Sequence, residues 1–173
     1  MRATADNQTM PLAAIALGAN LPSVFGPPEA ALRAAVVRIS ELGDVRAVSS
    51  FHDTEPVGYT EQPRFLNAAL LLETELAPLN LMSELLSIER ALGRDRSASP
   101  AKGPRTLDLD LLLYDAVVMH TEADATHPAL TLPHPEMHKR RFVLAPLKEI
   151  APEMIHTASD RTVAQLLAEL PAV

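Results

Sequence analysis

The sequence predicts an α+β fold: an antiparallel β-sheet with helices packed on one face, followed by a C-terminal helical extension. Segments with the periodicity of strands and helices follow one another in the order strand, helix, strand, strand, helix, strand. That order is the one of the ferredoxin-like fold, whose sheet is antiparallel and whose second face is then free for ligands. The length predicts a single domain over residues 1–173. Because 47% of the residues are apolar but only 3% are aromatic, aliphatic side chains must form the core.

The first half of the unit begins with a buried strand. Residues 13–17 are a short apolar run, and apolar residues then recur at helical spacing over residues 29–42. Residues 45–54 alternate between apolar and polar side chains, which predicts one half-buried strand. Residues 55–64 contain two prolines and a glycine and are predicted to be a loop. Residues 1–11 are polar and are expected to be frayed.

The second half repeats the pattern of strand, helix and strand. Residues 65–74 are an apolar strand candidate, and a helix is expected from Pro78, a favourable first-turn residue, to the stop at Gly93. Residues 94–104 are rich in serine, alanine and proline and predict a loop. Residues 106–114 alternate again, which predicts the last strand of the unit.

Short strands and helices are expected in the remaining residues. Residues 117–119 are a strand candidate, and residues 121–135 are predicted to be a long loop because they hold three prolines. A third helix is expected over residues 138–150, broken or bent at Pro146. Residues 162–170 predict a last helix, whose first residues fit a capping box.

Composition excludes several classes of protein. The formal net charge of −7 at pH 7 argues against a surface that binds nucleic acid or anionic membrane. The chain has no cysteine, which excludes disulfides, cysteine zinc sites and thiol nucleophiles. No apolar run reaches the roughly 18 residues that span a bilayer, and residues 1–10 lack the apolar stretch of a signal peptide. The default expectation is a cytoplasmic protein.

The strongest chemical signal is a pair of aspartates in the last strand of the unit. Alternation along a strand turns every second residue into the core, here the leucines Leu107, Leu109, Leu111 and Leu113. Asp108 and Asp110 then share the opposite face, about 7 Å apart. Two carboxylates at that spacing repel each other unless a cation lies between them, and Mg²⁺ prefers carboxylate and phosphate oxygens. The alternative is an outer face with two solvated aspartates.

Basic residues precede and follow this pair in the sequence: Arg94, Arg96, Lys102 and Arg105, then residues 138–141. Seven of the fifteen lysines and arginines therefore lie in two segments of an acidic protein. Carboxylates with convergent arginines fit phosphoryl transfer, in which metal ions and cationic side chains stabilise the phosphate charge. Basic segments that serve solubility, or a salt-bridge network without metal, are the alternatives.

Two further polar positions lie in unusual surroundings. Asn67 interrupts an apolar run and shares strand parity with Phe65, so it fits either a structural asparagine or an amide that binds the edge of a ligand stacked on Phe65. His134 and His138 have the spacing of a zinc pair. The metalloprotease pattern, however, requires a glutamate directly after the first histidine, where this chain has Pro135.

Residues 103–113, Gly-Pro-Arg-Thr-Leu-Asp-Leu-Asp-Leu-Leu-Leu, resemble the signature of the 6-hydroxymethyl-7,8-dihydropterin pyrophosphokinases of folate synthesis. This run is specific to the family. Further segments resemble the family in order and spacing, so that the resemblance extends over about residues 13–170: residues 16–21, 49–58, 62–68, 88–94 and 132–144. Each of these segments is weak evidence alone, but together they are strong.

The resemblance implies that ATP gives its β,γ-pyrophosphoryl group to the hydroxymethyl oxygen of the pterin and that AMP leaves. It implies that Asp108 and Asp110 hold two Mg²⁺ ions, and that Arg94 and Arg105 are catalytic residues on the phosphates. The positions that match nucleotide-contacting residues are Glu89, Arg96, Leu111, Thr131, His134 and Arg140. Those that match the pterin pocket are Thr54, Val57, Phe65, Asn67 and Phe142, with the ring between the two phenylalanines.

The chain departs from many family members at two positions. Lys102 stands where they have an aromatic residue, and Ala129 stands where some have a nucleotide-contacting arginine, which Arg141 is suggested to replace. Residues 94–104 are predicted to be a lid that a bound triphosphate orders. We expect a monomer whose partners are ATP and the pterin, with no nucleic-acid or membrane partner.

Two other functions remain open. One is a binding module on the same fold, such as a small-molecule sensor or an RNA-recognition domain, although RNA recognition by this fold needs exposed aromatic residues and the chain has only six. The other is a metal-dependent phosphohydrolase that uses the same two aspartates and needs no pterin acceptor.

Overall fold

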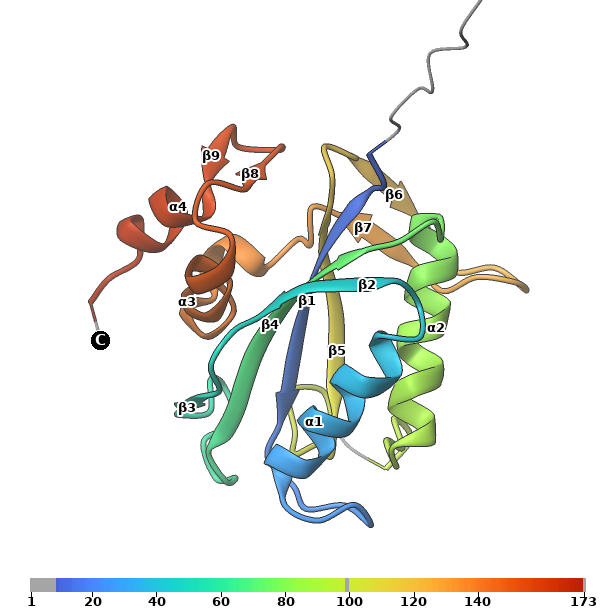
Figure 1. Cartoon of the computed structure of the whole chain (residues 1–173). Helices are drawn as coiled ribbons and strands as arrows, with labels where there is room; N and C mark the ends of the chain where they lie inside the picture. Colours follow the sequence, from blue (N-terminus) through green and yellow to red (C-terminus); the bar gives the residue numbers. More distant parts are fainter. Residues whose placement is uncertain (1–8, 99, 173) are drawn as a thin grey trace, which may run out of the picture.

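The computed structural model describes residues 9–98 and 100–172 (Figure 1). Its first seven elements are β1 (Leu12–Ala19), α1 (Pro28–Ile39), β2 (Asp44–Val48), β3 (His52–Thr54), β4 (Phe65–Glu73), α2 (Pro78–Ala91) and β5 (Asp108–Tyr114). Of the N-terminal segment expected to be frayed, residues 1–8 lie outside the described residues. The β1 strand begins directly after that segment.

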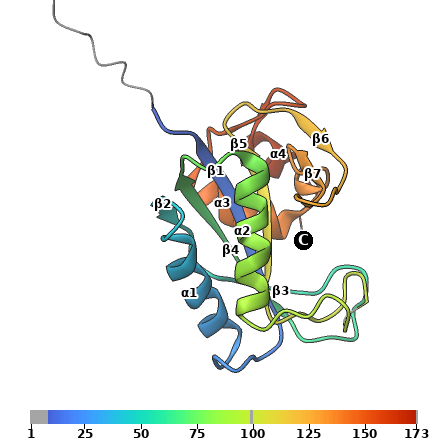
Figure 2. The ribbon, with the colours of Figure 1, turned by 90° about the vertical axis from the view of Figure 1, so that its right-hand side faces the viewer.

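The main sheet confirms the predicted fold class. Its strand order is β2-β4-β1-β5, β3 also pairs with β4, and every pairing is antiparallel. This is the order of the ferredoxin-like fold, in which each helix crosses one face between two strands. Figures 1 and 2 show α1 and α2 side by side on one face of the sheet, and α3 (Arg141–Ile150) on the other.

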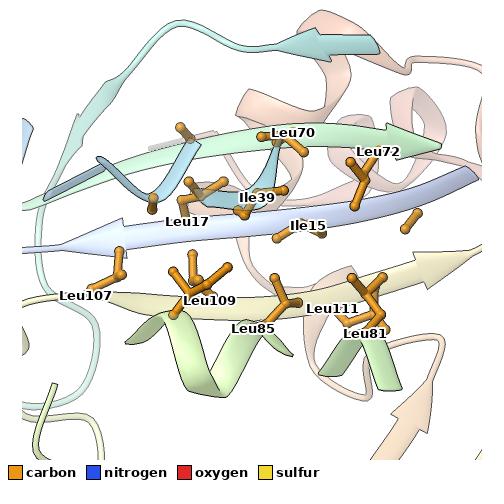
Figure 3. Packing of buried hydrophobic residues seen from close by; sticks show 14 of the residues in the cluster. Ile15, Leu17, Ile39, Leu70, Leu72, Leu81, Leu85, Leu107, Leu109 and Leu111 are labelled. Carbon is orange, nitrogen blue, oxygen red and sulfur yellow. The ribbon is translucent and has the colours of Figure 1, made fainter. Parts of the chain in front are cut away.

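The layer between the sheet and α1 and α2 is aliphatic, as the composition predicts. Side chains from both helices, such as Ile39, Leu81 and Leu85, are fully buried against Ile15 and Leu109 of the strands (Figure 3). Burial of one leucine or isoleucine side chain stabilises the fold by about 1.5–3 kcal/mol relative to its exposure. This layer fixes β5, and with it the two aspartates that β5 carries.

A β-bulge makes the prediction for Leu113 wrong. Ala14 of β1 pairs with Leu113 of β5, but the next residue, Ile15, pairs with Leu111, so that Leu112 is the extra residue. The alternation from Leu107 to Leu111 is as predicted, whereas Leu113 lies with Leu112 in the layer on the other face. A bulge reverses the faces of every residue beyond it, and alternation counted along the sequence does not show it. Asp108 and Asp110 precede the bulge, so their shared face is preserved.

The predicted strand over residues 45–54 is two strands, β2 and β3. The register of β2 against β4 shifts between Val45 and Ala47, and the ladder breaks after Val48. At the break, Ser49 still binds β4: its backbone N–H donates to the carbonyl group of Ala69, and its hydroxyl group accepts from the N–H of Ala69. The connection therefore stays attached to the sheet although its alternation changes.

The expectation that the second face of the sheet is free is wrong for half of that face. Val143, Leu144 and Leu147 of α3 are buried there, in one cluster with Ala14 and Ala69 of the sheet. The helix runs through Pro146 without a break, and it begins at Arg141, because residues 137–139 form a separate 3₁₀ turn, η1 (Met137–Lys139). Only the other half of this face, towards the C-terminal end of β1, stays open.

Two small hairpins and a helix complete the fold: β6 (Met119–Thr121) with β7 (Leu130–Leu132), β8 (Ile155–His156) with β9 (Arg161–Thr162), and α4 (Val163–Glu169). The β7 strand lies within the segment predicted to be a loop. The predicted capping box is confirmed: Thr162 accepts from the N–H of Gln165, whose side chain accepts from the N–H of Thr162. Among the described residues, no helix is long and apolar enough to cross a membrane.

Candidate active site

A cavity of about 470 Å³ occupies the open half of the second sheet face. Its floor is formed by β1, β4 and β5, and its walls by the start of α3 and by the loops after β3 and before β5. The structure brings nine of the predicted site residues to this cavity: Thr54, Val57, Phe65, Asn67, Arg105, Asp108, Asp110, Arg140 and Phe142. These residues come from four separate stretches of the sequence, 54–57, 65–67, 105–110 and 140–142, so the fold brings them together.

Asp108 lies at the centre of a cluster of arginines. Its Oδ2 accepts a hydrogen bond of 2.6 Å from Nη1 of Arg105. Its Oδ1 lies 3.7 Å from a guanidinium nitrogen of Arg94 and 3.7 Å from one of Arg96. The positive charges that the sequence places before β5 therefore converge on the first of the two aspartates, where a phosphate chain would find several donors.

Asp110 lies in a different environment from Asp108. Its carboxylate accepts no hydrogen bond from any other described residue. Burial and the neighbouring charges of Asp108 and Glu89 raise its pKa to about 7. A desolvated carboxylate beside a second carboxylate is stabilised by a bound cation. The two aspartates thus offer oxygen ligands of the type that Mg²⁺ prefers.

The protein alone does not offer a complete set of metal ligands. No group of three or more His, Cys, Asp or Glu side chains that could hold a metal occurs in residues 9–98 and 100–172. Mg²⁺ commonly takes one or two carboxylates and completes its octahedron with water and the phosphates of a substrate. The pair Asp108 and Asp110 fits that mode of binding and does not fit a closed structural site.

Glu89 ties the end of α2 to β5 and to the arginine loop. Its side chain is 1% exposed, and burial raises its pKa. One carboxylate oxygen accepts from the backbone N–H of Leu109, and both oxygens accept from the guanidinium group of Arg96. Glu89 therefore positions Arg96 and β5 behind the cavity, and it does not line the cavity itself.

Arg94 is held in the same region by the backbone. Its Nη1 donates to the carbonyl oxygen of Leu107 at 2.8 Å, and burial lowers the pKa of its guanidinium group. Its Nε and the hydroxyl oxygen of Thr106 are buried without a partner among the described residues. Buried donors without partners are rare in folded proteins, so both atoms suit a site that a charged ligand completes.

The aromatic half of the cavity fits a flat ligand. Phe65 and Phe142 enter it from β4 and α3, and the guanidinium group of Arg105 lies 5.3 Å from the centre of the Phe65 ring. Asn67 Nδ2 donates to the hydroxyl oxygen of Thr54 at 2.6 Å, and its Oδ1 accepts from no other described residue. Two rings with a free amide oxygen at their edge suit an aromatic ligand with hydrogen-bond donors.

Five of the six predicted nucleotide-contacting residues lie outside the cavity lining: Glu89 and Arg96, described above, and Leu111, Thr131 and His134. Leu111 is 1% exposed and lies in the core cluster, so its side chain does not reach the cavity. Thr131 Oγ1 lies 2.7 Å from Nδ1 of His120 on the β6–β7 hairpin. The backbone N–H of His134 donates to Leu112 of β5, and burial, together with the charge of Arg140, lowers the pKa of its side chain. The structure therefore places these three residues on β5 or on the segment beside it, and it does not bring them to the cavity.

Lys102 and Arg141, the residue suggested to replace the arginine missing at position 129, have different surroundings. Lys102 lines the cavity in a left-handed backbone conformation, with φ of 61°. Arg141 also lines the cavity, but its Nη2 donates to the carbonyl oxygens of Leu170 and Pro171. In the predicted lid, Ser99 lies outside the described residues.

Asn20 is a site residue to which the sequence pattern assigns no role. It is 3% exposed. Its Nδ2 donates to Oε1 of Gln62 and to the carbonyl oxygen of Pro63, and its Oδ1 accepts from the backbone N–H of Arg105. It thereby joins the end of β1 to both loops that wall the cavity. A lone polar residue directly after a buried apolar strand is the only signal for it in the sequence.

Residues 14–152 match a family described as 7,8-dihydro-6-hydroxymethylpterin-pyrophosphokinase. The chain is 43% identical over 143 residues to the 2-amino-4-hydroxy-6-hydroxymethyldihydropteridine pyrophosphokinase of Haemophilus influenzae, a match that covers 82% of each chain. It is 41% identical over 151 residues to the enzyme of the same name from Bacillus subtilis, covering 86% of this chain and 83% of that one.

Longer proteins also contain a matching segment. The folic acid synthesis protein fol1 of Schizosaccharomyces pombe is 33% identical over 163 residues, which is 93% of this chain but only 21% of fol1. A crystal structure of Plasmodium falciparum HPPK-DHPS matches with a TM-score of 0.72 at 14% identity, covering 92% of this chain and 41% of that one. The second likeness concerns the fold alone.

Proposed function

The chain belongs to the 7,8-dihydro-6-hydroxymethylpterin-pyrophosphokinase family, and from this membership and the geometry of the cleft we infer its reaction. It transfers the β,γ-pyrophosphoryl group of ATP to the hydroxymethyl oxygen of 6-hydroxymethyl-7,8-dihydropterin, with AMP as the second product, in folate biosynthesis. One observation supports this cleft as the site: a pair of aspartates among arginines shares a single cavity with two phenylalanine rings and an amide.

The phosphate half of the cavity consists of Asp108, Asp110 and the arginines around them. We propose that the two aspartates hold two Mg²⁺ ions. Bound there, the ions would supply positive charge that stabilises the triphosphate. Arg105 and Arg94 pair with phosphate oxygens near the β-phosphorus. Arg96 and Arg140 contact the rest of the nucleotide, and Glu89 supports Arg96. The remaining nucleotide-contacting positions of the proposal are Leu111, Thr131 and His134.

The pterin half of the cavity orients the acceptor. The ring lies between Phe65 and Phe142, with the Asn67 amide and the Thr54 hydroxyl group on its hydrogen-bonding edge and Val57 at its side. In that position the hydroxymethyl oxygen attacks the β-phosphorus and the oxygen that joins the α- and β-phosphates leaves with AMP. Such transfers need alignment and charge stabilisation more than a strong base, so no general base is assigned.

Three expectations about the whole chain remain part of this proposal. We propose one domain, a monomer and a cytoplasmic location. The two hydrophobic clusters on the two faces of one sheet support a single domain. Sedimentation of the purified chain at several concentrations tests the monomer: a mass near 18.7 kDa throughout is expected, and a mass that rises with concentration contradicts it.

The reaction is tested by incubating the chain with ATP, Mg²⁺ and 6-hydroxymethyl-7,8-dihydropterin and separating AMP from ADP. AMP that forms only when the pterin is present is the expected result. ADP in its place means transfer of a single phosphoryl group and contradicts the proposal. Inorganic phosphate without a pterin requirement indicates a phosphohydrolase, and binding of both ligands without turnover indicates a sensor.

A further inference from the structure

The C-terminal extension, residues 152–172, contacts one wall of the cleft at two places. We call this wall, formed by the cavity-lining residues Lys139, Arg140 and Arg141, the basic wall. At the first place, Arg141 donates to the carbonyl oxygens of Leu170 and Pro171 at 3.0 and 2.9 Å, just after α4. Figure 1 shows the extension packed beside α3, whose first residue is Arg141.

The second contact is a pair of histidine rings. His138 belongs to η1, directly before the basic wall, and His156 belongs to β8 of the extension. Their ring centroids are 5.7 Å apart, with an angle of 51° between the planes. His156 is 5% exposed, and its Nδ1 lies 2.8 Å from the hydroxyl oxygen of Ser159. Nδ1 of His138 is buried and has no partner among the described residues.

This arrangement tolerates little positive charge. Burial lowers the pKa of His156, and the positive charge that His138 acquires lowers it further. Two imidazolium ions this close repel each other in a poorly solvated place. Two positive charges on these rings would therefore favour their separation.

Other charged groups lie on the elements around the pair. They are Glu136 and Lys139 beside η1, Arg141 at the start of α3, Arg161 on β9 and Asp160 before it. Arg161 is paired with Glu169 of α4, and Glu136 lies 3.7 Å from Lys139. None of these carboxylates forms an ion pair with either histidine in the described part of the chain.

We propose that the His138–His156 contact positions the basic wall for the phosphates of ATP, and that it does so only while at least one of the two rings is neutral. The proposal deepens the function above, because its activity test presumes that ATP binds the cleft. His138, His156 and Arg141 are thereby positioning residues, which act through the wall and not on the reacting atoms.

The first test needs no substrate. Ring signals of the six histidines and backbone amide signals of residues 139–141 are followed by NMR as the pH is lowered from about 8 to about 5.5, the range in which histidines titrate. The wall amides are expected to shift with the midpoint of the His138 and His156 rings. Wall amides that do not move, or that follow another group, overturn the proposal even if the enzyme is active.

The second test compares pH profiles of the KM for ATP. In His156→Phe the ring remains but cannot be protonated. When the pH is lowered from about 8 to about 6, the KM for ATP of the wild type should rise about fivefold more than that of the variant. This factor corresponds to a small coupling between linked sites. The change in kcat should be equal in both proteins. His127→Phe, in the turn before β7, is the matched control and should keep the wild-type profile.

Identical KM profiles for wild type and His156→Phe overturn the proposal. If His156→Phe does not fold, the wild-type titration of the wall amides decides alone. Failure of the proposed function itself has a different signature: no AMP forms at any pH, while the NMR titration still reports whether the histidine pair moves the wall.

Discussion

Asp110 differs from Asp108 in lacking any positive partner at hydrogen-bonding distance, and this difference has a measurable consequence. Replacement of Asp110 by asparagine keeps the shape but removes a desolvated charge. We expect kcat to fall about 100-fold or more, the loss typical of a missing transition-state stabiliser, while the thermal stability of the metal-free protein at about pH 8 stays the same or rises. Initial rates and thermal melts in EDTA check both parts. Turnover retained at wild-type Mg²⁺ concentrations would refute the metal assignment.

The pKa of Asp110 also predicts a pH dependence of the Mg²⁺ requirement. Because that pKa is raised to about 7, the carboxyl group is increasingly protonated as the pH falls below this value, and a proton then competes with the metal. The Mg²⁺ concentration for half-maximal rate should therefore rise as the pH falls from about 8 to 6, by up to about tenfold for each unit below the pKa. Mg²⁺ titrations at each pH measure it. A requirement that does not change over this range contradicts the prediction.

Gly18 contributes to the site by leaving room for a neighbouring side chain, because it has no side chain of its own. A Cβ at this position would lie 3.0 Å from Oδ1 of Asn67, the amide oxygen proposed to bind the pterin. Gly18→Ala should displace the Asn67 side chain and raise the KM for the pterin about five- to tenfold, the value of roughly one hydrogen bond. The KM for ATP should stay near wild type. Steady-state kinetics with each substrate varied in turn separate the two constants, and an equal rise in both would place the damage elsewhere.

At the scale of elements, α2 holds β5 in place from the face opposite to the cleft. Leu85 of α2 is fully buried in the layer beneath β5. Leu85→Ala should lower the free energy of unfolding by about 2–5 kcal/mol, as expected for a cavity left in a packed core. Glu84→Ala, on the same helix and outside that layer, should change it by less than about 0.5 kcal/mol. Urea denaturation measures both. A loss below about 1 kcal/mol for Leu85→Ala would mean that the layer relaxes around the cavity.

Elements with long, regular patterns are predictable from the sequence, and irregular ones are not. Helical spacing predicts α1 and α2, apolar runs predict β1 and β4, and alternation predicts most of β5, with errors of a few residues at their ends. The faces of Leu113 and Ala47 depend on bulges, which are decided by the pairing of two strands and leave no trace in one of them. The three-residue β7 lies in a proline-rich segment whose composition predicts a loop. The strand pattern alone predicts a free second sheet face, which α3 in fact half covers.

For the candidate site, the sequence predicts which residues share a strand face but not which loop residues meet them. Alternation along the strands is sufficient to put Asp108 and Asp110 on one face, and Phe65 and Asn67 on one face. The convergence of Arg94, Arg96 and Arg105 on Asp108 depends on how a loop folds back, which periodicity does not encode. Asn20 and Glu89 act through hydrogen bonds to residues distant in the sequence, and no spacing rule points to such contacts.

For the whole molecule, binding of the nucleotide with its metal should appear as stability. A ligand that binds only the folded state stabilises it by about 2.7 kcal/mol at 100 times its Kd. We expect ATP with Mg²⁺ to raise Tm by several degrees and ATP with EDTA to raise it much less, because the aspartates repel an unaccompanied triphosphate. Differential scanning fluorimetry checks this, with Asp110→Asn as the control that loses the difference. Equal shifts with and without EDTA would show binding independent of Mg²⁺.

The buried hydrogen bonds of Asn20 have a thermodynamic consequence for the cleft. They hold the segment around Gln62 and Pro63 and the backbone of Arg105 in place before any ligand arrives. Each backbone residue so restrained has already lost conformational entropy worth about 1–2 kcal/mol during folding. That loss is not incurred again when pterin and nucleotide bind. In the wild-type protein, folding itself therefore supplies part of the affinity of the cleft. Calorimetry on Asn20→Ala should show ligand binding with a more unfavourable entropy than in the wild type.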